Sequence, residues 1–470
     1  MARLSSRPGS RGAPGVSAGP PSRAAVLGWI LFDPACQPFF TLVTTFVFAP
    51  YATAILASDP VRGQALWGYA TAAAGLALAV LSPVLGSVAD AGGRMKPWIA
   101  GALAVMAAAS AGLWWAAPGA PSALLLALGL YAVGTVAAEI AAVFNNAMMG
   151  RLAGPDRMGR LSGYGWGAGY AGGLVSLAIV LGFLAASPET GRTLAGLPPL
   201  FGLDPARHEG DRIVGPLSAL WMVLLAWPLF LWTPDGARSG RPWREAVGTG
   251  LRGLRRTIGE ARGKPALARF LLANMVYQDG LVALFAFGGV YGAGILGWGA
   301  IALGVFGILL TVAGTLGAIL GGILEDRTGP RPVILGSLAV LTLVCVAILS
   351  IGREHVLFVV PVAPPEPRRL FGSWPERLFL VCGCLIGAVA GPLQASSRAL
   401  LARSVPPAEA GRYFGLLSLS GKLTSFLAPL AVAVATELTG RQSAAPLVLI
   451  AFFAAGAALM PRRDPEAASG

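Results

Sequence analysis

The sequence predicts an all-α, polytopic membrane protein with twelve transmembrane helices arranged as two parallel-repeat six-helix bundles. Three observations predict it: the composition, the recurrence of long apolar stretches, and an internal repeat. Of the 470 residues, 55% are hydrophobic and 12% are charged, and the mean hydropathy is +0.68. An average soluble protein has about 25% charged residues. The composition therefore excludes an ordinary soluble domain.

Apolar stretches of about 20 residues, the length that crosses a hydrocarbon core about 30 Å thick, recur along almost the whole chain. They are expected near 26–56, 66–89, 97–117, 122–148, 161–186, 216–232, 266–293, 300–324, 332–352, 377–400, 412–436 and 444–461. The sixth is the shortest and is interrupted by Trp227 and Pro228. The four cysteines fall in these spans, where we expect them to pack as small apolar residues.

The domain organisation follows from these spans. We expect a disordered basic tail (1–25), an N-terminal six-helix bundle (26–232), a cytoplasmic basic linker (233–265), a C-terminal six-helix bundle (266–461) and a short tail (462–470). The N-terminal tail has no acid and no apolar core before Ala24, so a disordered tail is favoured over a signal or transit peptide. The linker contains WREAVGTGLRGLRRTIGEARGK, a pattern typical of a short basic amphipathic helix on the membrane surface.

The distribution of basic residues predicts the orientation. Of the 35 Lys and Arg, 25 lie in the tails and the connections from even to odd spans, nine lie in the opposite connections, and Lys422 lies inside a span. Arg398 and Arg403 are counted among the 25. By the positive-inside rule both termini are cytoplasmic. The net charge of +13 then reflects contact with anionic headgroups, and nucleic acid is not needed as a partner.

Two pairs of segments repeat between the halves. GSVADAGGRMK (86–96) matches GILEDRTGPR (322–331) at an offset of 236 residues, and RLAGPDRMGRLSGYGWGAG (151–169) aligns without gaps on RSVPPAEAGRYFGLLSLSG (403–421) at an offset of 252. The second pair has six identities in 19 positions. Two like units in the same orientation predict a parallel-repeat transporter, with the solute bound between the halves near the bilayer midplane.

The first repeated motif predicts a conformational latch on the cytoplasmic side. Its candidate residues are Gly86, Asp90, Gly93 and Arg94 in the first half, and Gly322, Asp326, Gly329 and Arg331 in the second. Both aspartates sit at helix C-terminal ends, where the helix dipole disfavours an acid. We expect Arg94 and Arg331, or the N-terminus of a neighbouring helix, to compensate. The alternative interpretation is a solvated turn.

The motif GxxxDxxGRxK and its second copy resemble the signature loop of the major facilitator superfamily. Three blocks are similar to the branch of fungal vacuolar amino-acid effluxers of autophagy and their bacterial relatives: FLLANMVYQDGLVALFAFGGVYGAGILG (270–297), RLSGYGWGAGYAGGL (160–174), and GPLQASSRALLARSVPP with YFGLLSLSGKLTSFLAPL (391–430). Where that branch usually reads aspartate, tryptophan, alanine, asparagine, this chain has Asp33, Pro34, Ala35 and Cys36. The resemblance implies a transporter, which we place in a bacterial inner membrane.

The first span carries unusual polar residues and prolines. Asp33, Gln37, Thr41 and Thr44 recur at helical spacing and form one stripe. Pro34 and Pro38 leave the carbonyls of Ile30 and Pro34 without their helical partners. Such backbone is tolerated at depth only where protein or water satisfies it. We interpret the segment as an opened helix facing a wet cavity; the alternative is a packing kink with Asp33 near the cytoplasmic headgroups.

Ionisable and amide side chains inside spans supply the candidate binding site, because a charge at the bilayer centre costs about 2.5 to 3.5 kcal/mol and usually faces a cavity or a partner. The predicted solute-binding residues are Asp33, Gln37, Asn145, Asn146, Asn274, Gln278, Gln394, Ser397 and Lys422. Asp33, Glu139 and Asp279 are the candidates for proton coupling, since a buried acid can carry a proton. For each amide the alternative is an interhelical hydrogen bond, and for Lys422 it is a structural salt bridge with one of the acids.

These observations predict a secondary active transporter that works by alternating access on a small polar solute, amino-acid-like or zwitterionic, with proton coupling. We expect a monomer in the lipid bilayer, with a small-molecule solute and a proton as partners and with no cofactor or metal. The alternative is an exporter of amphipathic drugs or metabolites. A polytopic membrane enzyme is disfavoured because the only histidines, His208 and His355, lie in outside loops and no catalytic motif is present.

Overall fold

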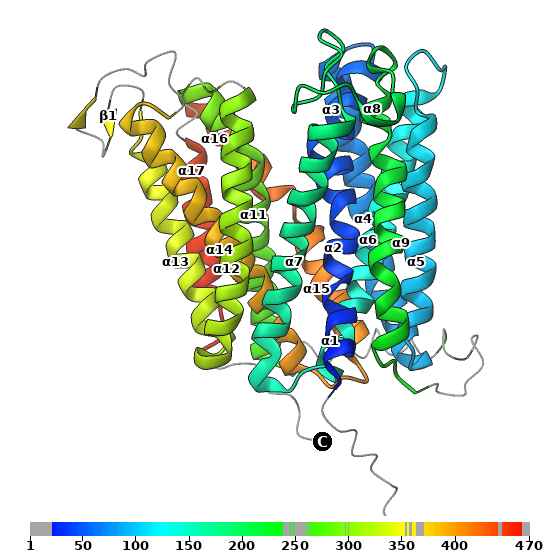
Figure 1. Ribbon diagram of the computed structural model, residues 1–470. Helices are drawn as coiled ribbons and strands as arrows, with labels where there is room; N and C mark the ends of the chain where they lie inside the picture. Colours follow the sequence, from blue (N-terminus) through cyan, green and yellow to red (C-terminus); the bar gives the residue numbers. More distant parts are fainter. Residues whose placement is uncertain are drawn as a thin grey trace, which may run out of the picture.

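The computed structural model describes residues 21–462 except 238–244, 246–247, 249–258, 260–262, 297, 299, 353–354, 357–359, 363–370 and 440–443, and it leaves the side chains of 60–61, 286–290, 293–295, 300–301, 422–423 and 433 undescribed. Two helical bundles stand side by side (Figure 1). Their helices approach each other at the lower end of the view, where α1 begins and the C-terminus lies, and diverge towards the upper end. We call these the terminal end and the far end. Most of the expected basic linker lies outside the described residues.

The first bundle begins with a broken series of helices. It consists of α1 (Arg23–Ile30), α2 (Phe32–Pro38), a π-helix (Phe39–Phe46), α3 (Phe48–Tyr51) and a second π-helix (Ala52–Leu56). The longer helices follow as α4 (Pro60–Gly92), α5 (Lys96–Gly112), α6 (Ala123–Ala147), α7 (Met158–Ile179) and α9 (Val214–Trp232). The short helix α8 (Glu209–Arg212) and several 3-10 turns lie in the connections.

The second bundle has a similar order. Its helices are α11 (Pro265–Leu296), α12 (Ala300–Thr328), α13 (Pro330–Leu349), α14 (Trp374–Ser404), α15 (Ala410–Leu423), α16 (Leu427–Thr439) and α17 (Ala444–Leu459). Two short antiparallel strands, β1 (His355–Val356) and β2 (Val360–Pro361), pair with His355 opposite Pro361 and Val356 opposite Val360. They lie at the far end (Figure 1).

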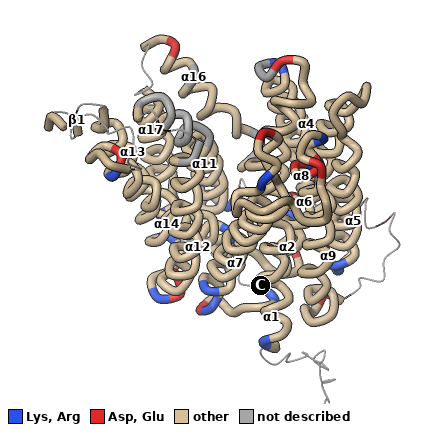
Figure 2. Tube along the Cα trace, turned by 45° about the horizontal axis from the view of Figure 1, so that its top comes forward, with Lys and Arg blue, Asp and Glu red and all other residues tan. Residues whose placement is uncertain are grey.

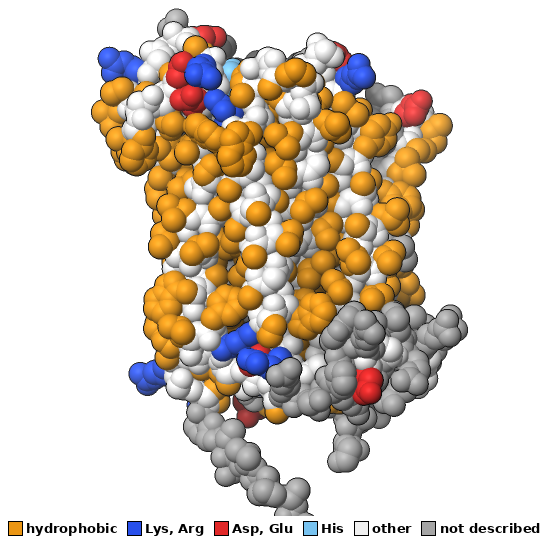
Figure 3. Space-filling model, turned by 90° about the vertical axis from the view of Figure 1, so that its right-hand side faces the viewer, with side chains coloured by type: hydrophobic (Ala, Val, Ile, Leu, Met, Phe, Trp, Pro, Cys, Tyr) orange, Lys and Arg blue, Asp and Glu red, His pale blue; other side chains and the backbone are white. Residues whose placement is uncertain are grey.

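Each of the twelve expected spans corresponds to one helix or to a broken series of helices, which confirms the predicted two-bundle fold. In the described part of the chain, nine spans are long and apolar enough to cross a membrane, and two of the later helices are shorter. Charged residues gather near the two ends of the helices (Figure 2), and a wide apolar belt separates them (Figure 3). The belt is what a protein surrounded by lipid requires.

The first span is opened as its prolines predict, and protein satisfies the freed backbone. The helix is interrupted at Leu31, and a π-helix starts directly after Pro38. The carbonyl of Pro34, which loses its helical donor to Pro38, accepts a hydrogen bond of 3.0 Å from the indole Nε1 of Trp221 in α9. This part of the opened helix is therefore secured inside the first bundle.

Glycines set how closely the two bundles approach at the terminal end. A Cβ atom on Gly86 of α4 would lie 2.3 Å from the carbonyl oxygen of Gly411 in α15. On the other flank, a Cβ atom on Gly163 of α7 would lie 2.4 Å from the carbonyl oxygen of Ala318 in α12. Small residues allow backbones to pack directly, as in membrane helix pairs generally. Any larger side chain here must push the bundles apart.

Replacing Gly86 by valine should therefore open the terminal end and destabilise the state described here. We expect the Gly86→Val variant to melt several degrees lower in detergent, because overpacking of a tight contact typically costs about 1 to 3 kcal/mol. Gly75→Val in the same helix is the matched control, since a Cβ atom there meets no atom within 4 Å. Equal melting temperatures for the two variants would contradict the close backbone contact.

Candidate functional site

An ion pair connects the two bundles. The Nη1 atom of Arg398, in α14 of the second bundle, lies 3.1 Å from Oδ2 of Asp33, in α2 of the first. The side chains are 7% and 19% exposed, so water screens the pair little. Arg398 is six residues before the end of α14, which places it about 9 Å inside that end at 1.5 Å per residue. The pair lies towards the terminal end and below the middle of the helix.

The guanidinium of Arg398 donates hydrogen bonds to several groups of the first bundle. Nη1 also donates to Oδ1 of Asn146 at 3.1 Å. Nε donates to the hydroxyl of Ser162 at 2.9 Å, and Nη2 donates to its carbonyl oxygen at 2.7 Å. The indole ring of Trp29 lies 4.9 Å below the guanidinium carbon, within the range of a cation–π contact. One buried cation of the second bundle is thus held by four helices of the first, α1, α2, α6 and α7.

The orientation argument misplaced Arg398, which it counted with the basic residues of the cytoplasmic connections. The residue is 6% exposed and lies within α14, because three polar groups of the other bundle offset its desolvation. A signal for this was present in the sequence: residue 398 is residue 146 displaced by the repeat offset of 252 residues. A polar residue occurs at this position in both halves.

This correspondence locates the axis that relates the two bundles. Arg398 and Asn146 occupy equivalent positions of the repeat, and they contact each other directly. Equivalent positions of two related bundles can meet only near the axis between them. The cluster of Trp29, Asp33, Asn146, Ser162 and Arg398, which we call the axial cluster, therefore lies near the axis between the two bundles.

The two motif aspartates each bind the N-terminus of a helix in the opposite bundle. Asp90 accepts hydrogen bonds from the backbone N–H groups of Gly411 at 2.9 Å and Arg412 at 2.7 Å. Asp326 accepts them from Gly159 at 2.9 Å and Arg160 at 3.3 Å. The expected compensation by a neighbouring helix N-terminus is confirmed. Each carboxylate meets the positive end of a helix, which favours its charge.

The motif arginines have other roles. Arg94 binds Asp235 at 3.4 Å, and Asp235 also accepts from the backbone N–H of Met95 at 2.8 Å. Arg331 has a buried Nε without a hydrogen-bond partner among the described residues. Neither arginine is seen to pair with its motif aspartate among the described residues, so of the two expected ways of compensation the helix N-termini are the one observed.

The motif glycines divide into two kinds. Gly93 and Gly329 follow helices α4 and α12 with φ of 80° and 85°, a conformation that residues with a side chain adopt at a cost. Gly322 provides close approach in the same way as Gly86, because a Cβ atom on it would lie 2.5 Å from the carbonyl oxygen of Gly159. Gly93 and Gly329 thus turn the chain after each helix. Gly86 and Gly322 let the helices approach closely enough for the aspartates to reach the opposite bundle.

A second buried acid lies beside Asp326 and was not predicted. Glu325 is 0% exposed and directly precedes Asp326. It accepts a hydrogen bond from Ser396 at 2.7 Å, and its Oε1 lies 3.0 Å from Nη2 of Arg403. The equivalent position of the first half is Ala89, so the two flanks differ in charge. Because the neighbouring aspartate is the motif residue, the sequence pattern drew no attention to Glu325.

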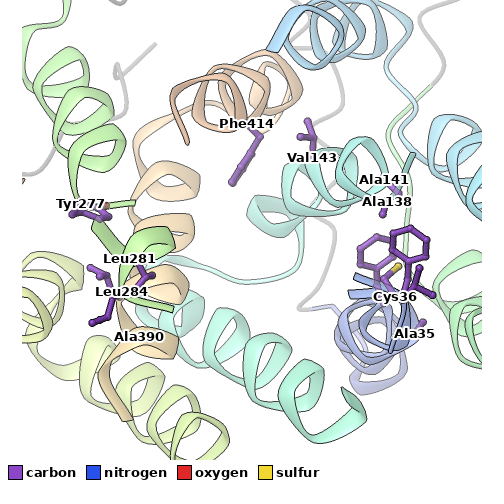
Figure 4. Close-up of a cluster of buried hydrophobic side chains, with 14 of the residues drawn as sticks. Ala35, Cys36, Ala138, Ala141, Val143, Tyr277, Leu281, Leu284, Ala390 and Phe414 are labelled. Atoms are coloured by element: carbon purple, nitrogen blue, oxygen red, sulfur yellow. The ribbon is translucent and has the colours of Figure 1, made fainter. Parts of the chain in front are cut away.

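The remaining candidates of the second bundle are close together but apart from the axial cluster. Ser397 forms a hydrogen bond of 2.7 Å with the hydroxyl of Tyr277, and Asn274 donates to the hydroxyl of Ser420 at 3.3 Å. Gln394 donates to the carbonyl of Ala390 at 3.4 Å, and Gln278 is partly exposed. Figure 4 shows Tyr277 near Ala390, where α11 packs against α14.

In the first bundle, Gln37 donates to the hydroxyl of Thr41 at 3.5 Å, and Glu139 of α6 is partly exposed. Asn145 is fully buried, and its side-chain atoms have no hydrogen-bond partner among the described residues. Asp279 of α11 is 1% exposed. The side chain of Lys422 lies outside the described residues. Of the predicted residues, Asp33 and Asn146 are brought together through Arg398, which binds both.

Removing the cation of the axial cluster should destabilise the protein strongly. Arg398→Ala leaves Asp33 with its charge poorly solvated, and breaking one side of a buried pair typically costs about 3 to 5 kcal/mol. We expect a large drop in the melting temperature of the purified protein, and partial recovery when Asp33→Asn is added. Arg377→Ala in the same helix is the control, because Arg377 is exposed. A similar drop in the melting temperature of Arg398→Ala and Arg377→Ala would contradict the buried pair.

Comparison with known proteins gives a consistent result. The family model described as "Vacuole effluxer Atg22 like" matches residues 53–468. An uncharacterised MFS-type transporter of Bacillus subtilis, YxiO, is 26% identical over 440 residues, which cover 92% of this chain and 93% of that protein. Autophagy-related protein 22 of Cryptococcus neoformans is 26% identical over 239 residues, 49% of this chain but only 40% of the fungal protein.

Solved structures share the fold. The human organic anion transporter MFSD10 superposes with a TM-score of 0.66 at 16% identity, covering 94% of this chain and 100% of that one. The major facilitator superfamily transporter FucP, in its outward conformation, gives 0.65 at 14% identity, with coverage of 94% and 99%. The chain therefore belongs to the Atg22-like family within the major facilitator superfamily, and it is a multi-pass membrane transporter and not an enzyme.

Proposed function

We propose that the protein exports a small, polar, amino-acid-like solute by alternating access, and that the terminal end faces the cytoplasm. The observation that carries this proposal is the axial cluster, in which a buried cation of one bundle donates its hydrogen bonds, among the described residues, to groups of the other. Such a contact has two states, formed and broken. The described conformation would be the one closed to the cytoplasm.

Closure at the terminal end rests on two layers of contacts. The outer layer is the pair of aspartates, Asp90 and Asp326, bound to helix N-termini across the interface. The inner layer is the ion pair between Arg398 and Asp33. Both layers must separate before the bundles can open on this side. The predicted latch then has a physical basis, because in both layers a charged group of one bundle binds groups of the opposite bundle.

A proton on Asp33 would weaken the inner layer. The neutral acid would keep a hydrogen bond to Arg398 but lose the attraction between full charges, which is large at low exposure. Arrival of a proton at Asp33 would therefore favour opening, and this is the proposed coupling step. Glu139 remains a second candidate carrier on α6.

The solute would bind further from the terminal end, among amides and hydroxyls of both bundles. Gln37 lies one turn beyond Asp33, while Gln278, Asn274 and Gln394 come from the second bundle. Groups of this kind suit a small polar molecule better than an amphipathic drug, which calls for a broad apolar cavity. An apolar cavity of about 510 Å³ lies among α4, α5 and α6 of the first bundle and is lined by Trp98 and Phe144 among others. Its lining does not include the amides and hydroxyls named above. The description of the matching family as an effluxer supports export as the direction.

The substrate class can be tested with purified protein in proteoliposomes. Candidate solutes are first identified by the rise that each produces in the melting temperature, across amino acids, small peptides, polyamines and sugars. The best solute is then measured in counterflow. Saturable exchange of an amino-acid-like solute would support the proposal, while exchange limited to apolar cations would favour the drug-exporter alternative.

The Asp33→Asn variant should test whether Asp33 couples transport to a pH gradient. We expect it to exchange solute across the membrane but to lose most of the stimulation by a pH gradient, because the amide cannot take up the coupling proton. The measurement is uptake with and without an imposed gradient. Asp59→Asn is the control, since Asp59 caps α4 outside the apolar belt and asparagine can replace it there. An unchanged response to the gradient in Asp33→Asn would exclude Asp33 as the coupling residue.

A further inference from the structure

A second buried carboxylate has no role in the closure just described. Asp279 lies in α11 and is 1% exposed. Its Oδ1 atom is buried without a hydrogen-bond partner among the described residues. An unpaired carboxylate oxygen deep in a membrane protein is costly, so such a residue is normally matched to a cation, a proton or a ligand.

The residue that faces Asp279 lies at a break in a helix. Among the described residues, the hydroxyl of Thr424 is the side-chain group that interacts with this carboxylate. Thr424 follows the last residue of α15 with φ of −117° and ψ of 5°, and α16 starts only at Leu427. Its Oγ1 atom is also buried without a well-formed hydrogen bond to a described group. The carboxylate of Asp279 and the hydroxyl of Thr424 therefore interact, but Oδ1 of Asp279 and Oγ1 of Thr424 have no well-formed hydrogen bond to a described group.

Asp279 and Thr424 lie at the same depth in the membrane. Each is 14 residues beyond the start of its helix, Pro265 in α11 and Ala410 in α15, which is about 21 Å at 1.5 Å per residue. The hydrogen bond from Asn274 to Ser420 fixes this register about one turn closer to the terminal end. The break is therefore near the middle of the bilayer, above α15 and below α16 in Figure 1.

The break also leaves backbone carbonyl oxygens that can bind a cation. The last four carbonyls of a helix have no partner in the following turn, and in α15 these belong to residues 420–423. They form the negative end of the helix dipole, which favours a cation. The first N–H of α16 is already used, because Leu427 donates to the carbonyl of Thr424 at 2.7 Å. The break thus leaves carbonyl acceptors at the end of α15, while this donor is occupied.

We propose that Asp279, Thr424 and the carbonyl end of α15 form a binding site for Na⁺ in the second bundle. One carboxylate balances one positive charge, so a monovalent ion leaves the buried site neutral, whereas a divalent ion would carry uncompensated charge. Unwound backbone and helix C-terminal ends are the groups that coordinate Na⁺ in other transporters with broken helices. The site is separate from the axial cluster and does not depend on the identity of the solute. It assigns Na⁺ to a residue, Asp279, for which the sequence predicted a proton.

The test is ion-specific stabilisation of the full-length protein in detergent, without solute. NaCl is titrated against choline chloride and KCl at constant ionic strength, and the melting temperature is followed. We expect a saturable rise with Na⁺ that the other two salts do not reproduce. Asp279→Asn and Thr424→Val should raise the Na⁺ concentration needed for half of the effect by at least about tenfold. Thr424→Ser keeps the hydroxyl and should respond like the parent protein.

Controls separate this site from the other proposals. Asp33→Asn should keep the Na⁺ response, because Asp33 belongs to the axial cluster. No Na⁺-specific shift in the parent protein, or an undiminished shift in Asp279→Asn, would overturn the site. Stabilisation by low pH alone, lost in Asp279→Asn, would make Asp279 a proton site and also overturn it. Mutual rescue of Asp279→Asn and Lys422→Met without a Na⁺ effect would identify an ion pair in its place.

Discussion

The closed arrangement of the two bundles depends on the solvation of Arg398 by the opposite bundle. A guanidinium with 7% exposure has lost most of its water, and its replacement acceptors come from Asp33, Asn146 and Ser162. In the proposed alternating access, the bundles would have to exchange these contacts for water or for a ligand. Two stable arrangements would then be favoured, since intermediate separations leave the cation with neither set of partners.

Two nearly symmetric flanks surround this centre. On each flank an aspartate at the end of one helix binds the first amides of a helix in the other bundle, and glycines bring the backbones into contact. The symmetry is broken by charge. Arg160 of α7 pairs with Asp326 across one flank. The ion pair of Glu325 with Arg403 lies beside it within the second bundle, where the first half has Ala89 at the position of Glu325. The two flanks therefore differ in charge.

The two broken spans have different consequences. In the first span, the carbonyl freed by Pro38 is satisfied by Trp221, so the opening is part of the packed first bundle. In the eleventh, Thr424 at the break faces the buried Asp279. Polar atoms without a hydrogen-bond partner remain at the second break among the described residues, so this break is the one that can bind a ligand. A helix break is thus a functional indication only when its polar groups are left over after packing.

The sequence alone determined the membrane environment, the twelve spans and the internal repeat, because apolar length, charge and periodicity are local properties of the chain. It also identified both motif aspartates and the positions Asp33 and Asn146. It could not identify the partners, since these come from residues hundreds of positions away. Arg398 was assigned to a connection because a lone arginine near the end of an apolar stretch normally reaches the headgroups. Only the tertiary structure, by placing three polar groups of the other bundle around it, made burial of that cation energetically acceptable.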